Sequence, residues 1–315
     1  GIVVNGQLNL LGAVTSNDSI SVYTTSDLLL NNKLETISSQ DIYVGSAGNL
    51  TINGAKKIHG TDSVTVSAGQ DVVLQIGHLA SAEINLQANQ GKIDEKAIFS
   101  LDTAKLNATA SGNILLDSHL NQLRQVNVCN TNGSITVGNG NITNVDLNIA
   151  ITTPDFIVGG DLIVHNYANG EANNIVLADK LKATGNISII NDEANVGVGT
   201  YADISAKNIT FQATNHNVVM TGGQLTATEK VRFDGVDVIV IGGNIQSATA
   251  ELIAADDISL TKGTIKSATA NLNANGISDN ENNGSAITES DGFMLDVDTL
   301  QAKAVNAISL ASKSN

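Results

Sequence analysis

The sequence predicts an all-β fold in which the chain winds as a single parallel β-helix, a solenoid of stacked coils. The stretch from Asn217 to Asn275 nearly repeats itself, because Leu225, Ile245 and Ile265 recur at one constant interval. Hydrophobic residues reach 42%, but aromatic residues only 3%, and the chain contains one Pro. Such a composition suits stacked strands, because Val, Ile and Leu pack well in sheets and Pro removes a backbone donor.

A four-residue pattern of polar, aliphatic, any and aliphatic residues marks the strands, because such alternation buries one face. It occurs at 19–22, 27–30, 41–44, 49–52, 63–66, 71–74 and 83–86. Short and long steps alternate between these runs, and one short step with the next long step makes one coil. We therefore expect about 15 coils of about 20–22 residues, each with two strong strands and a weaker third. Ile58, Leu79 and Leu101 are the predicted members of the third strand.

Small residues after a strong strand predict the corners of the coils, because they let the backbone bend without a side-chain clash. Such corners occur at 66–69, 106–109, 211–214 and 252–255. No long stretch has apolar residues at helical spacing, so the sequence predicts few or no helices.

We expect one domain over residues 1–315, with three excursions from the coil where the strand pattern is interrupted. These excursions are predicted near 165–174, 191–201 and 279–291. Loops of this kind, or one flat face, commonly carry the function of a solenoid.

The charge and the single cysteine restrict the partners and the covalent chemistry. The formal net charge is −15, which repels nucleic acid, so no nucleic-acid partner is expected. Cys129 has no second cysteine with which to form an internal disulfide. The opening residues, GIVVN, carry no export signal, and no apolar run long enough to span a membrane follows. We expect the chain to be a mature or excised segment.

The units at 66–74 and 106–116 resemble the haemagglutinin-type repeats of filamentous haemagglutinin-like exoproteins. These are large adhesins and contact-dependent inhibition proteins that Gram-negative bacteria export by two-partner secretion. The resemblance is one of pattern and covers nearly the whole chain. It implies a right-handed β-helical fibre, secreted or at the bacterial cell surface, with an outer-membrane transporter as its partner during export. The only proline is Pro154, so the Asn-Pro-Asn-Gly type motif of the family's secretion domain is absent, which predicts an interior segment.

Paired carboxyls are the first candidates for catalysis, because β-helical enzymes act on polysaccharides with acidic groups in a groove. The candidates are Asp256 with Asp257, Asp234 with Asp237, and Asp296 with Asp298. Strand alternation places the first pair on opposite faces and the last pair on one face. With no Trp and four Tyr to hold a sugar, we expect these carboxyls to be solvated surface and predict no catalytic residue.

The sequence predicts neither a metal site nor a cofactor site. The histidines lack a repeated ligand spacing; they are His59, His78, His119, His165 and His216. Cys129 is expected to be an inert residue of a coil. Six sequons begin at Asn49, Asn107, Asn132, Asn141, Asn186 and Asn208. Strand alternation in an Asn- and Thr-rich chain explains them without glycosylation.

The expected function is that of a structural and adhesive rod, not of an enzyme. Such a rod would attach to a host or neighbouring cell surface, through a receptor or a glycan, or project a binding or effector region. One alternative is a filament whose subunits associate end to end through open strand edges. A second alternative is an enzyme that acts on polysaccharides along one face.

Overall fold

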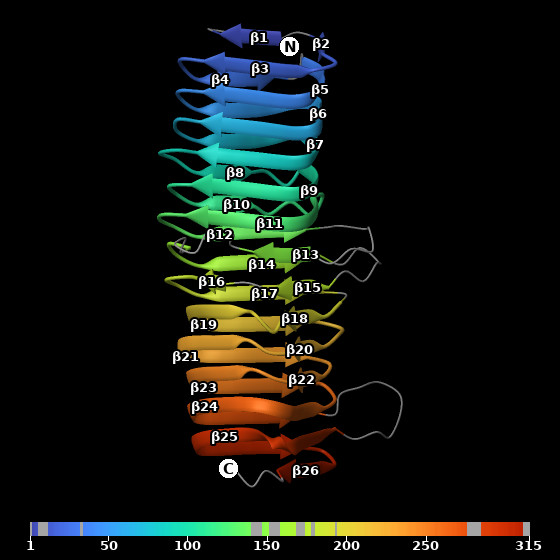
Figure 1. Ribbon diagram of the computed structural model, residues 1–315, viewed down its shortest axis with the longest axis vertical. Coiled ribbons are helices and arrows are strands. Elements are labelled where there is room, and N and C mark those ends of the chain that lie inside the picture. The colour runs from blue at the N-terminus through green and yellow to red at the C-terminus, as the bar shows by residue number, and fades with distance from the viewer. Residues whose placement is uncertain are drawn as a thin grey trace. The chain divides into compact units, whose positions relative to one another are not determined.

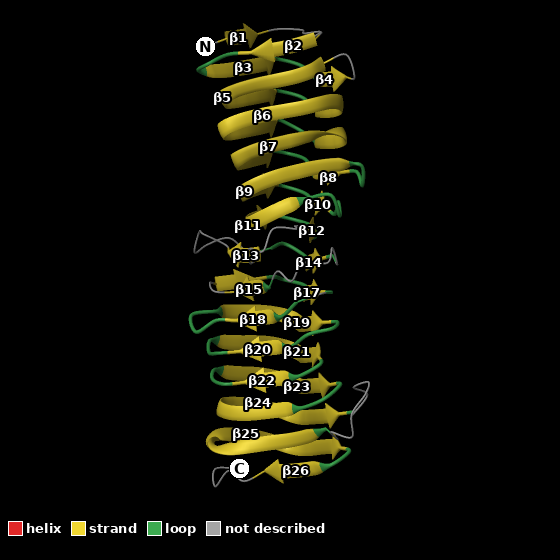
Figure 2. Cartoon of the chain, turned by 90° about the vertical axis from the view of Figure 1, so that its right-hand side faces the viewer, coloured by secondary structure: helices red, strands yellow, loops and turns green. Residues whose placement is uncertain are grey.

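A computed structural model describes residues 2–5, 12–31, 34–139, 147–150, 158–167, 174–177, 180–192, 194–275 and 285–310. The chain divides into two compact units. Unit 1 comprises Gly1–Ile142 and Phe156–Gly160, and unit 2 comprises Thr143–Asp155 and Asp161–Asn315. Strands and short turns make up the described residues, which include no helix (Figure 2). Consequently, no described segment is a helix of the length and apolarity needed to cross a membrane.

Unit 1 is a parallel β-solenoid whose strands lie one below another (Figure 1, blue to green). Its strands are β1 (Ile2–Asn5), β2 (Gly12–Thr15), β3 (Ser19–Thr24), β4 (Leu28–Asn31), β5 (Leu34–Ser46), β6 (Leu50–Ala68), β7 (Val72–Ala88), β8 (Ile93–Glu95), β9 (Phe99–Ala110), β10 (Ile114–Leu116), β11 (Gln122–Asn130) and β12 (Ile135–Asn139).

The inward aliphatic residues of unit 1 stack in register, as the spacing predicts. The first strong strand gives the column Ile20, Ile42, Val64, Ile84, Leu106 and Val126. The second gives Leu28, Leu50, Val72, Ile93, Ile114 and Ile135. The predicted third strand is confirmed, because Ile58, Leu79 and Leu101 are buried and pair in sequence.

Unit 2 is also a parallel β-solenoid (Figure 1, green to red). Its strands are β13 (Leu147–Ala150), β14 (Leu162–Asn166), β15 (Ile175–Leu177), β16 (Lys180–Lys182), β17 (Ile187–Asn191), β18 (Val196–Val198), β19 (Asp203–Ala213), β20 (Val218–Met220), β21 (Gln224–Gly235), β22 (Val238–Val240), β23 (Asn244–Ala254), β24 (Ile258–Ala274), β25 (Ala286–Ala304) and β26 (Ala307–Leu310).

The near-repeat of the sequence is the stacked core of unit 2. Leu225, Ile245 and Ile265 pair in successive coils, and each is buried. Leu252 and Leu272 form a second buried pair in the same coils. One period of the repeat therefore returns the same side chain to the same interior position, which confirms the predicted parallel solenoid.

The number of coils is slightly lower than the sequence predicts. About 11 turns can be followed through the described residues, against the roughly 15 expected from the spacing. Long coils account for part of the difference. The coil from Ile258 to its partner Ile287, for example, is longer than the coil from Val238 to Ile258 that precedes it.

The structure describes parts of the three predicted excursions. The stretch 191–201 contains β18, whose Val196 and Val198 are buried and pair with neighbouring coils, so the strand pattern continues there. The coil likewise continues through Asn166 in β14 and from Ala286 in β25. Residues 168–173 and 279–284 of the predicted excursions lie outside the described residues. The prediction of one domain over 1–315 stays a prediction.

Tight corners in unit 2 depend on glycine. Gly223 and Gly243 have φ angles of +82° and +96°, which side chains rarely tolerate. A Cβ atom at Gly223 would also lie 2.6 Å from the carbonyl oxygen of Ala202 in the preceding coil. Glycine at these two positions therefore allows both the turn and the close stacking of coils.

Replacing an inward aliphatic residue by a charge should destabilise unit 2. Ile245 is 1% exposed between Leu225 and Ile265, so Ile245→Asp would lose aliphatic contacts and bury an unpaired carboxylate. We expect a loss of about 4 kcal/mol or more in the free energy of unfolding, measured by urea denaturation. Gln246→Asp, at the exposed neighbouring position, should change stability by less than about 1 kcal/mol. Equal losses in both variants would contradict the inward placement of Ile245.

Candidate functional site

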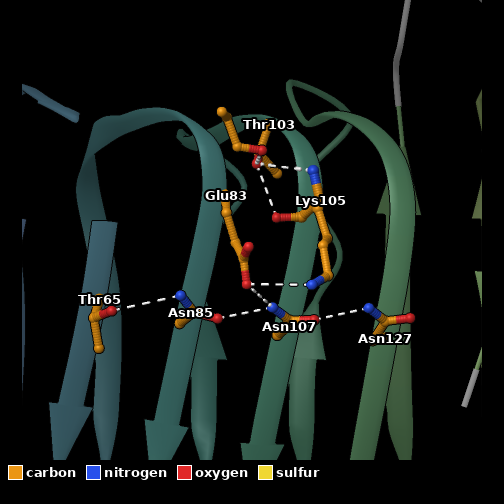
Figure 3. A network of polar contacts seen from close by, with 8 residues as sticks. Thr65, Glu83, Asn85, Thr103, Lys105, Asn107 and Asn127 are labelled. Carbon is orange, nitrogen blue, oxygen red and sulfur yellow. Dashed lines mark hydrogen bonds and ion pairs between the residues drawn. The ribbon is translucent and has the colours of Figure 1, made fainter. Parts of the chain in front are cut away.

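A row of side chains on the outer face of unit 1 forms an amide ladder, which we define as Thr65, Asn85, Asn107 and Asn127 (Figure 3). These residues occupy one register position in four successive coils. Asn107 Nδ2 donates to Asn85 Oδ1 at 2.8 Å, and Asn127 Nδ2 donates to Asn107 Oδ1 at 2.7 Å. Asn85 Nδ2 lies 3.5 Å from Thr65 Oγ1. The ladder joins coils through side chains in addition to the backbone.

A charged pair lies beside the amide ladder. Lys105 Nζ is 3.4 Å from Glu83 Oε1, which also accepts a hydrogen bond of 2.6 Å from Asn107 Nδ2 (Figure 3). Both charged side chains are accessible to water, so the ion pair itself contributes little to stability. Glu83 also connects the pair to the ladder, through its hydrogen bond with Asn107.

A second row, the Asx ladder, runs along unit 2 and consists of Asn174, Asn195, Asn217, Asp237 and Asp257. In each step the Oδ1 atom accepts the backbone N–H of the equivalent residue in the next coil, at 3.0–3.1 Å. Asp257 Oδ1 continues the series by accepting from the backbone of Ala286 at 2.8 Å. Each of the five residues directly precedes an inward aliphatic residue, so the polar position of the strand pattern supplies the ladder.

One member of each of two aspartate pairs, Asp237 and Asp257, belongs to the Asx ladder. Asp234 binds Arg232 Nη2 at 2.6 Å, whereas Asp237 accepts the backbone N–H of Asp257. The two carboxyls therefore have different partners. Asp256 and Asp257 lie in the corner between β23 and β24. The prediction that strand alternation places Asp256 and Asp257 on opposite faces is therefore wrong, because neither residue lies in a strand. Partial desolvation, with the charges of Asp257 and Asp237, raises the pKa of Asp256.

Asp296 and Asp298 lie in β25 with exposed side chains. Asp296 Oδ2 is 3.6 Å from Lys266 Nζ of the neighbouring coil. In register, Asp296 also pairs with Lys266. An exposed carboxyl beside an exposed ammonium is a common surface arrangement, and its energetic contribution is small.

Two of the histidines each contact one polar side chain of a neighbouring coil. His78 Nδ1 is 2.7 Å from Ser100 Oγ, and burial lowers the pKa of His78. His165 Nε2 is 2.9 Å from Asp192 Oδ2. Within the described residues no three His, Cys, Asp or Glu side chains gather to hold a metal ion. Burial raises the pKa of the Cys129 thiol, which disfavours the reactive thiolate.

The described asparagines of the sequons differ in whether their side chains bond to a neighbouring coil. Four of them donate Nδ2 hydrogen bonds to side chains of neighbouring coils: Asn49, Asn107, Asn186 and Asn208. Asn132 is exposed at a corner, and Asn141 lies outside the described residues. The side chains of four of the six sequon asparagines thus join neighbouring coils.

A hollow of about 930 Å³ lies on the surface of unit 2 and crosses several coils. Its walls include Asp203, Gln224, Asn244 and Thr264, which stack at one register position. Corner glycines, among them Gly223 and Gly243, also line the hollow. Tyr201, 86% exposed, stands at its edge. The hollow thus combines an aromatic ring with a row of hydrogen-bonding groups.

Sequence reasoning missed a buried carboxyl in unit 1. Glu95 occupies the second aliphatic position of the strand pattern, in register with Leu74 of the preceding coil. Burial raises the pKa of Glu95 to about 8. The spacing of the pattern could have found it, because a glutamate stands where the equivalent residues of neighbouring coils are aliphatic.

No protein-family model, curated protein or solved structure matches the chain. The stacked parallel coils define the chain as a β-helical repeat protein.

The Asx ladder makes a testable contribution to stability. Asp237→Ala removes the acceptor for the Asp257 N–H, whereas Asp237→Asn keeps an acceptor at the same place and removes the charge. We expect the alanine variant to be less stable than the asparagine variant by about 1 kcal/mol in urea denaturation at neutral pH.

Asp237→Asn should also lower the pKa of Asp256, because one of the charges that raise it is removed. NMR titration of the Asp256 carboxyl would measure this change. For the stability comparison, equal free energies of unfolding of Asp237→Ala and Asp237→Asn would contradict the role of Asp237 as acceptor for the Asp257 N–H.

Proposed function

We propose that the chain is a structural and adhesive segment of a secreted or surface-attached bacterial exoprotein. The observation that carries the proposal is the use of outward polar side chains to join successive coils, as in the amide and Asx ladders. Such ladders maintain an extended stack of coils, which suits a stalk that projects a binding or effector region. The resemblance to filamentous haemagglutinin-like repeats supports the same class of function.

The proposed partners follow from this class and from the charge. The adhesive partner is a host or neighbouring cell surface, recognised through a receptor or a glycan, and an outer-membrane transporter is the partner during export. A net charge of −15 disfavours polyanionic partners, so nucleic acid is not among them.

The hollow of unit 2 is the surface that best fits attachment. A glycan is bound by hydrogen bonds to its hydroxyl groups and by contact with aromatic rings. The stacked residues Asp203, Gln224 and Asn244 offer the hydrogen bonds, and exposed Tyr201 offers the ring.

Cell binding tests this proposal. Fluorescently labelled chain should bind saturably to epithelial cell monolayers or to Gram-negative bacterial cells. Tyr201→Ala should weaken this binding several-fold, because it removes the exposed ring at the hollow. Tyr43→Ala, which removes another exposed tyrosine on unit 1, should bind as the unchanged chain does. Absence of saturable binding to both cell types would refute the adhesive role. Equal loss of binding in the two variants would refute the hollow as the binding site.

End-to-end association into a filament is the second candidate. Stacked parallel coils can add a further coil at an open strand edge, because such an edge presents unpaired backbone groups. Negative-stain electron microscopy at increasing concentration should show fibres that lengthen if this association operates, and separate particles at all concentrations if it does not.

We further propose that the chain turns over no substrate. The alternative enzyme would use Asp296 and Asp298 on polysaccharide. Incubation with a panel of neutral and acidic polysaccharides should release no reducing ends. Release that disappears in the Asp296→Asn and Asp298→Asn variants would establish the enzyme instead.

A further inference from the structure

Glu95 interrupts an otherwise aliphatic interior column of unit 1. It ends β8, pairs in register with Leu74, and is 3% exposed. A carboxyl group at such a position loses its hydration, so it must be neutral or be satisfied by protein donors. The protein supplies only part of what a carboxylate needs here.

Glu95 Oε2 accepts hydrogen bonds from the backbone N–H of Ser118 at 3.2 Å and from Asn121 Nδ2 at 2.9 Å. Glu95 Oε1 is buried without a hydrogen-bond partner. Two donors at one oxygen and none at the other leave an ionised carboxylate poorly compensated, whereas a protonated carboxyl requires much less.

Glu95, Ser118 and Asn121 together form a polar seam that joins consecutive coils. Asn121 Oδ1 accepts the backbone N–H of Leu101 at 2.9 Å, and its Nδ2 atom also reaches the carbonyl oxygen of Gly138 at 3.3 Å. Ser118 Oγ donates to the carbonyl oxygen of Phe99 at 2.7 Å. The seam therefore holds the turns near 96–98 and 117–121 against their neighbours, where side chains replace part of the strand pairing.

The charges around the seam do not favour ionisation of Glu95. Asp117, on the turn that packs against it, acts as a like charge and adds to the effect of burial on the pKa of Glu95. Lys92 and Lys96 bind Asp94 on the outer face of β8. His119 is exposed on the same turn as Asp117, and Leu74 in the preceding coil is uncharged.

We propose that the polar seam is a pH-sensitive switch: protonated Glu95 keeps these turns of unit 1 closed, and loss of its proton to solvent opens them locally. The opened form exposes the carboxylate to water together with the donors of Ser118 and Asn121. The rest of unit 1 stays stacked, because its interior columns are aliphatic.

The direction of the pH dependence follows from the linkage between proton binding by Glu95 and opening of the turns. Burial raises the pKa of Glu95 from 4.5 to about 8 in the closed form, so the closed form binds the proton that the open form loses. Opening therefore becomes easier as the pH rises between these two values, by at most about tenfold per pH unit. Above a pH of about 8 both forms are ionised and the dependence levels off.

Hydrogen exchange measured by mass spectrometry on the whole chain, from about pH 5 to about pH 9, tests the proposal. After correction for the intrinsic exchange rate, peptides covering 93–123 should lose protection steadily up to about pH 8. Peptides covering 50–68 should keep theirs, which makes the unchanged chain its own control. Glu95→Gln keeps the shape and the acceptor oxygen without the titrating proton, so its exchange should be independent of pH.

Asp94→Asn is the matched control, because Asp94 neighbours Glu95 but faces outward and binds lysines. It should show the same pH dependence as the unchanged chain. A pH-dependent loss that persists in Glu95→Gln would overturn the proposal. So would an equal loss over 50–68, because unit 1 would then unfold as a whole.

Discussion

In-register stacking of parallel coils is the constraint on which the rest of the structure depends. Each coil lies about 4.8 Å from the next, so a residue of a strand has an equivalent in the neighbouring coil wherever the register is unbroken. An aliphatic residue at an inward position must therefore be matched in neighbouring coils, as Leu225, Ile245 and Ile265 are in unit 2. Backbone hydrogen bonds between coils are satisfied only while this register holds, which links the length of each coil to the burial of its side chains.

The same constraint governs the polar side chains. Asn85, Asn107 and Asn127 recur at one outward position and bond to one another, and the residues of the Asx ladder bond to the backbone of the next coil. Recurrence of asparagine and aspartate at one surface position thus lets their side chains bond from coil to coil. Inside, it makes a single polar residue conspicuous, because Glu95 lies in a column of aliphatic residues and needs partners that only its own turns can supply.

Alternation and spacing predicted the parallel solenoid, its three strands per coil and its lack of helices among the described residues, because these properties repeat. Properties that do not repeat were harder to predict. The sequence pattern is interrupted at 191–201, where we expect an excursion, whereas the structure has β18 there with Val196 and Val198 buried. Alternation likewise predicts a strand at Asp256 and Asp257, which lie in a corner between β23 and β24. The hollow beside Tyr201 arises from stacked turns, which a linear pattern of side chains does not display.

Cysteine cross-linking between coils tests the register most directly. In a Cys129→Ser background, Gln246→Cys with Lys266→Cys places two outward thiols at paired positions of adjacent coils. Gln246→Cys with Asp296→Cys places them two coils apart, at about twice the coil spacing. A disulfide requires Cα atoms within about 7 Å, so mild oxidation should join the first pair within one chain and leave the second pair reduced. Cross-linking of the second pair but not the first would contradict the stacked register.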